Sequence, residues 1–147
     1  MDFAGYLQFL TKLGQQFQQL VEIEQEKLQA VTTGNLAVLN DCMRKEQAAS
    51  LALRGLEQQR SQWIANLGLP EGPLSDLPNV CPAPYRGQAA QVVRTVLDQF
   101  RVLEGARKAS RSLLEGQLHK IEKNLDPDEE PGQQPQVPQR TWTDFRA

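Results

Sequence analysis

The sequence has almost no net charge, because sixteen basic residues stand against eighteen acidic ones and leave −2. A chain with so weak an overall field is not drawn to nucleic acid or to an anionic membrane surface, so any partner must be recognised locally. No run of about eighteen apolar residues is present that could span a membrane. The chain opens with Met1 to Ala4, which lack the basic and then apolar pattern of a signal peptide. We therefore predict a cytosolic protein.

Residues that bind metals or form disulfides are scarce. Cys42 lies in a helical pattern and Cys81 in a proline-rich stretch, without a CxxC spacing or neighbouring histidines. Two reduced thiols are the expected state in the cytosol. His119 is the only histidine, so a zinc site would have to be assembled from scattered carboxylates. We expect neither a metal nor another cofactor.

Catalytic signatures are lacking as well. The glycines of the middle region, such as Gly68 and Gly72, are scattered and do not form a phosphate-binding loop between a strand and a helix. A serine nucleophile would depend on His119 as its base, and nothing in the sequence supplies an oxyanion hole. Paired carboxylates such as Glu22 and Glu26 are typical of a solvated helix face. The sequence predicts a protein that is not an enzyme.

Apolar residues recur at steps of three and four along most of the chain, which is typical of helices with one apolar stripe. The pattern predicts helices over about 3–33, 36–67 and 86–125. Asp2 is placed to cap the first helix, Gly34 to end it and Asn35 to cap the second. The first two helices, each about 45 Å long, should form an antiparallel hairpin. We predict an elongated all-α fold, a three-helix bundle of coiled-coil type in which a long third helix joins the hairpin.

Polar residues interrupt these apolar stripes. Glu24 and Lys27 stand in the stripe of the first helix, and Glu46 and Arg60 in that of the second. Polar groups at such positions of a helical bundle usually fix the register of the helices or remain hydrated.

Proline dominates the stretch between the second and third helices. Five prolines between Gly68 and Pro84 remove backbone donors and fix φ, so we expect the connector 68–84 to contain no regular element. Residues 126–147 are rich in proline, glutamine and acidic residues, with too few apolar side chains to offset the entropy of ordering. We predict a helical domain over 1–125 and a disordered C-terminal tail. Trp142 and Phe145 indicate either a docking peptide or an incidental end of this tail.

The end of the third helix carries the candidate binding site. A helix of about 40 residues spans about 60 Å and outruns a hairpin of about 45 Å. The apolar residues near its end then lack a partner within the chain: Leu114, Leu118, Ile121 and Leu125. An uncovered stripe commonly marks a helix-in-groove or coiled-coil contact, and a fully buried stripe is the alternative. Basic residues on the same helix are interleaved with glutamates, which indicates a solvated face and not a nucleic-acid site.

Several short motifs follow one another in a characteristic order. Leu20-Val21-Glu22 leads to Leu28, a Gly34-Asn35 turn precedes Leu36 and Leu39, and Lys45-Glu46 and Arg60 precede Asn66-Leu67-Gly68-Leu69. In this order and spacing, residues 1–125 resemble the FlgN family of flagellar export chaperones. The family often carries two asparagines before a Leu-Leu step on the third helix, and here Arg107 and Ser110 precede Leu113-Leu114.

The resemblance implies a cytoplasmic chaperone that works without nucleotide and is a monomer or weak dimer. Its clients would be the C-terminal helical segments of hook-associated (hook–filament junction) proteins, which it would deliver to the flagellar export apparatus. Family members use the C-terminal part of the chain for the client, and an aromatic residue near the end can engage the export gate. Trp142 is the nearest candidate for that role, and Phe145 is the second. Two alternatives remain open: a self-associating coiled-coil scaffold, and a chaperone of a related virulence-type secretion system.

Overall fold

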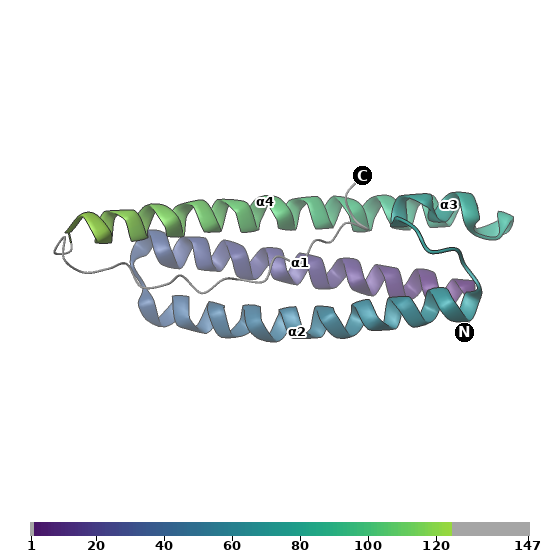
Figure 1. The fold of residues 1–147 in the computed structure, drawn as a ribbon, viewed down its shortest axis with the longest axis horizontal. Coiled ribbons are helices and arrows are strands. Elements are labelled where there is room, and N and C mark those ends of the chain that lie inside the picture. Colours follow the sequence, from purple (N-terminus) through teal and green to yellow (C-terminus); the bar gives the residue numbers. More distant parts are fainter. Residues whose placement is uncertain (1, 125–147) are drawn as a thin grey trace.

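The fold is built from three long helices, as the computed structural model of the protein shows for residues 2–124, with side chains described as far as Lys120. The long helices are α1 (Phe3–Thr33), α2 (Leu36–Leu67) and α4 (Arg86–Asn124) (Figure 1). Residues 2–124 contain no strand. The predicted all-α fold, with a helical hairpin and a long third helix, is confirmed. The predicted tail 126–147 lies outside the described residues.

The residues that begin and end the hairpin helices act as the sequence predicts. The Asp2 carboxylate accepts a hydrogen bond of 2.8 Å from the Gly5 amide and caps α1. Gly34 ends this helix with φ 70°. This left-handed conformation is not strained in glycine, because glycine has no Cβ. Asn35 then accepts a 3.2 Å hydrogen bond from the Val38 amide and caps α2. The chain therefore reverses within two residues, and α2 runs back along α1.

Helix α1 occupies the middle of the bundle and packs against both α2 and α4 (Figure 1). The α4 helix runs parallel to α1, since Phe3 lies 5.2 Å from Tyr85 and Phe17 lies 5.4 Å from Phe100 between ring centroids. On the other side, Trp63 near the end of α2 contacts residues near the start of α1, as an antiparallel pair requires. α1 supplies the largest share of the apolar core.

The connector differs from its prediction, because it contains three short helical turns: η1 (Leu74–Asp76), α3 (Leu77–Val80) and η2 (Ala83–Tyr85). Proline is compatible with the first turn of a helix, where its missing N–H would have no partner, and α3 and η2 each carry a proline there. Leu74, Leu77 and Cys81 are buried against the core. The prolines therefore shape a folded cover over one end of the bundle.

The length of α4 decides where the bundle ends. At 1.5 Å per residue, its 39 residues span about 58 Å, against about 46 Å for the 31 residues of α1. The Ser110 hydroxyl lies 3.4 Å from the Glu24 carbonyl oxygen, so α4 passes the Gly34 turn about ten residues later, near Lys120. Figure 1 shows the end of α4 projecting beyond the turn between α1 and α2.

Candidate protein-binding site at the end of α4

The stripe of α4 that faces the bundle is closed in its first half and open in its second. Val93, Val96, Leu97, Phe100 and Leu103 are all buried, with at most 7% of each side chain exposed. Beyond them, Leu113 and Leu114 are only half-buried. Leu118, one turn later, is 43% exposed. The packing of α4 therefore loosens towards its C-terminal end.

The predicted site residues fall on this open part of α4. Leu114, Leu118 and Ile121 follow one another at steps of four and three, which places them on one face of the helix. The side chain of Ile121 and the whole of Leu125 lie outside the described part of the chain, as do Trp142 and Phe145. Among the predicted site residues whose side chains are described, Leu118 is thus the one that is clearly exposed to solvent.

A polar layer, buried at Glu24 and Ser110 and partly exposed at Lys27 and Glu46, lies between the closed half of the bundle and the open half. It consists of Glu24 and Lys27 from α1, Glu46 from α2 and Ser110 from α4. The Lys27 ammonium lies 3.0 Å from a Glu46 carboxylate oxygen and 3.8 Å from Glu24 Oε2. Ser110 donates a hydrogen bond to the Glu24 carbonyl oxygen. These contacts join all three long helices and hold α4 in one register on the hairpin.

Glu24 is the most deeply buried member of the polar layer, with 2% of its surface exposed. Burial raises the pKa of its carboxyl above the ordinary value of 4.5, the Glu46 carboxylate raises it further, and the Lys27 ammonium opposes both effects. Within the described part of the chain, Glu24 Oε2 is buried without a hydrogen-bond partner. The sequence marks Glu24 as an interruption of the stripe, and the structure shows that it is buried beside Lys27, Glu46 and Ser110.

Ser110 also explains part of the departure from the Asn-x-x-Asn pattern. Its small side chain is 3% exposed and fits beside the α1 backbone, whereas Arg107 is only half-buried. The serine hydroxyl therefore supplies a polar contact between helices at a position where an amide is expected from the resemblance.

Other exposed apolar side chains lie outside the predicted site. Leu36 at the start of α2 is 72% exposed and Met43, two turns later, is 48% exposed. Both belong to the half of α2 that adjoins the turn, at the same end of the bundle as the end of α4 (Figure 1). The apolar periodicity of α2 places Leu36 and Met43 in the same stripe as its core residues. Their exposure therefore could not be predicted from the sequence and is seen only in the packed structure.

The reactive and metal-binding groups of the described residues form no second candidate site. Cys42 and Cys81 are buried free thiols, and burial raises the pKa of the Cys42 thiol. Among residues 2–124, no three His, Cys, Asp or Glu side chains form a group that could hold a metal ion. No helix in the same part of the chain is long and apolar enough to cross a membrane.

The similarity of the chain to known proteins covers the whole described bundle. The model of one protein family, described as FlgN protein, matches residues 1–126. The chain belongs to the FlgN family. No curated protein and no solved structure matches it. FlgN proteins are flagellar export chaperones and not enzymes, so this FlgN-family chain is a flagellar export chaperone whose partners are flagellar proteins.

Proposed function

We propose that the protein binds the C-terminal helical segments of hook-associated proteins, its clients, through the stripe Leu114, Leu118, Ile121 and Leu125. It keeps these segments dispersed in the cytoplasm and delivers them to the flagellar export gate. The observation that supports this proposal most is the open second half of α4. There Leu118 is exposed, whereas the apolar stripe in the first half of the same helix is buried.

The energetics of the stripe suit a reversible complex with an apolar helix. Full burial of one exposed Leu or Ile side chain contributes about 1.5–3 kcal/mol, so roughly 6–12 kcal/mol is the upper bound for four of them before the costs of association. The gain is smaller than this bound because Leu114 is already half-buried and Leu118 is 43% exposed in the free protein. A client helix that lays its apolar face along α4 would be protected from aggregation by the same contact. Because the site lies in the last third of α4, beyond its packed stretch 93–103, the client would not have to open the aromatic core around Phe17 and Phe100.

Delivery would use a different part of the chain. Trp142 and Phe145 dock on the export apparatus in this proposal, and residues 126–139 act as the tether between the docked aromatic residues and the helical domain 1–125. A linker rich in proline and acidic residues is extended, so both contacts can form at once.

A charge placed in the stripe tests the client site. We expect Leu118→Asp with Ile121→Asp to abolish capture of a hook-associated C-terminal segment, because a carboxylate in a desolvated contact costs several kcal/mol. The helical content of the free protein should remain nearly unchanged, since Leu118 is already partly hydrated. Isothermal titration calorimetry measures the affinity and circular dichroism the helicity.

Leu51→Asp with Val102→Asp is the matched control, because these side chains are 67% and 57% exposed and lie outside the stripe. The control should bind the client normally. Unfolding of the Leu118/Ile121 variant would show instead that the stripe belongs to the core.

The same stripe could pair with a second copy of the chain, as in a coiled-coil scaffold. Sedimentation analysis over a wide range of concentration, without client, separates the two functions. A monomer or a weak dimer supports the chaperone, whereas a stable oligomer disrupted by the Leu118/Ile121 variant supports the scaffold.

A further inference from the structure

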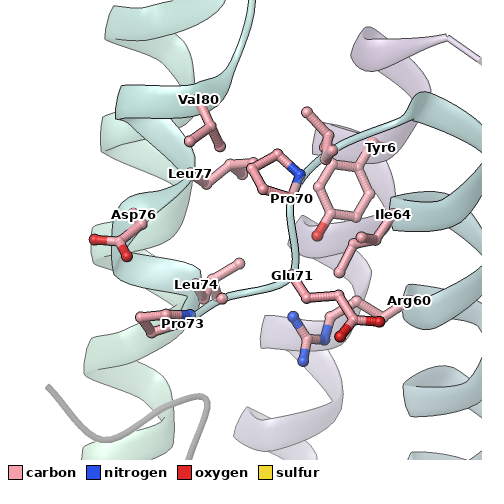
Figure 2. A pocket seen from close by; sticks show the side chains of 12 residues that line it. Tyr6, Arg60, Ile64, Pro70, Glu71, Pro73, Leu74, Asp76, Leu77 and Val80 are labelled. Carbon is pink, nitrogen blue, oxygen red and sulfur yellow. The ribbon is translucent and has the colours of Figure 1, made fainter.

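A cavity of about 200 Å³ lies at the opposite end of the bundle from the open stripe. Its walls come from three parts of the chain: Tyr6 on α1, Ile64 on α2, and Leu74, Leu77 and Val80 in the connector (Figure 2). Tyr6, Leu74 and Leu77 are buried and form a fixed floor, while Val80 is 39% exposed at the edge. The folded connector therefore creates an apolar pocket that is open to solvent.

The charges around this pocket are mainly acidic. Arg60 is 4% exposed, and its guanidinium donates to the Glu57 carboxylate at 3.0 and 3.1 Å, so its charge is compensated within α2. Glu71 and Asp76 are exposed residues that line the pocket from the connector. Figure 2 shows the Glu71 carboxylate on the same side as Arg60, and Asp76 on the opposite side with its carboxylate directed outward at the edge. An occupant with an apolar body and flanking positive charges fits this arrangement.

The size of the pocket limits what it can hold. Cofactors and drug-sized ligands occupy about 300–1,000 Å³, so 200 Å³ corresponds to a single large side chain. Trp142 is such a side chain, and Arg140 and Arg146 flank it and Phe145 in the sequence. An aromatic ring between cations is complementary to an apolar pocket with an acidic edge.

The length of the chain after α4 permits this contact within one molecule. The pocket lies beside the first turns of α4, so the chain beyond Asn124 must return along most of the helix, about 50–58 Å. Trp142 lies eighteen residue steps beyond Asn124, and the seventeen residues between them include four prolines. At about 3.1 Å per residue for an extended proline-rich segment, the eighteen steps reach about 56 Å.

We propose that residues Arg140–Arg146 bind this pocket of the same molecule, with the Trp142 indole inside it and the two arginines beside Glu71 and Asp76. The contact folds the tail back along the bundle and covers the aromatic residue to which we assign export docking. The export apparatus then has to displace Trp142 from the pocket before it can use it. This inference rests on the pocket and the tail and does not depend on how the client binds.

The full chain contains two tryptophans, so its indole N–H signals in NMR spectra test the proposal directly. Trp142→Phe assigns the two signals without touching the described bundle. We expect the Trp142 indole to lie away from the position of an unstructured peptide and to show nuclear Overhauser effects to methyl groups of Leu77 and Val80. A Trp142 signal at the unstructured position, without such effects, overturns the proposal.

Charge reversal at the pocket provides the second test. Glu71→Lys with Asp76→Lys should lower the docking equilibrium about tenfold, since two exposed attractive charge pairs become repulsive. Glu115→Lys makes the same kind of change at an exposed site on the far half of α4 and should leave the Trp142 signal unchanged. Equal effects of both changes overturn the assigned site. The contact must also survive tenfold dilution, because loss on dilution would show that a second copy supplies the tail.

Discussion

At the scale of single residues, Glu24 contributes to how the stability of the bundle depends on pH. Burial and the Glu46 carboxylate raise its pKa in the folded protein above the ordinary value of 4.5. Between the unfolded and the folded pKa, the native state therefore binds more protons than the unfolded state. The stabilisation gained by protonating Glu24 in the folded protein is fully present below the unfolded pKa. It is lost as pH rises through the folded pKa.

Glu24→Gln removes this titration while keeping the size and shape of the side chain. We expect the variant to raise the free energy of unfolding at pH 7 by about 1 kcal/mol, as often follows when a buried charged group is replaced by an uncharged one. The gain should vanish at pH 4, where the wild-type carboxyl is protonated. Urea unfolding at several pH values measures both effects.

The exposed Glu22→Gln on the same helix is the control and should change little at any pH. A loss of stability in Glu24→Gln at pH 7 would instead mean that the pairing with Lys27 outweighs the cost of burying the charge.

At the scale of whole elements, the hairpin depends on the conformation of one glycine. Gly34 has φ 70°, and a Cβ there would meet no atom within 4 Å, so replacement costs backbone strain alone. Gly55 lies inside α2, and a Cβ there also meets nothing within 4 Å. We expect Gly34→Ala to destabilise the protein by about 1 kcal/mol and Gly55→Ala to stabilise it by about 0.5–1 kcal/mol. Thermal unfolding of the two variants gives shifts of opposite sign, and two shifts of one sign would contradict this account.

The elements differ in how far the sequence could predict them. The hairpin helices and their caps were predictable because Asp2, Gly34 and Asn35 act on neighbouring backbone groups. The turns of the connector were not, because they depend on burial of Leu74 and Leu77 against distant helices. The apolar periodicity of α4 was enough to predict the candidate stripe. The exposure of Leu118 depends on the parallel register of α4 on α1, and no local feature of the sequence specifies that register.

At the scale of the whole molecule, the two ends of the bundle have different surfaces. One end carries the open stripe near the end of α4, and the other carries the solvent-open pocket that the connector forms. The fully packed core lies between them, around Phe17 and Phe100. A client on the open stripe therefore leaves the pocket uncovered, where we propose that Trp142 is held until it docks on the export apparatus.

This separation predicts that client binding and delivery can be removed independently. Truncation after Leu125 keeps the entire stripe, so we expect the affinity for the client to change by no more than a few-fold while secretion of the client falls. Trp142→Ala alone should reproduce much of that defect, because a buried indole commonly dominates a small interface. Calorimetry with the client segment and a secretion assay in cells measure the two functions. Normal secretion by the truncated protein would show that the tail is passive, and loss of the client would place the tail within the binding surface.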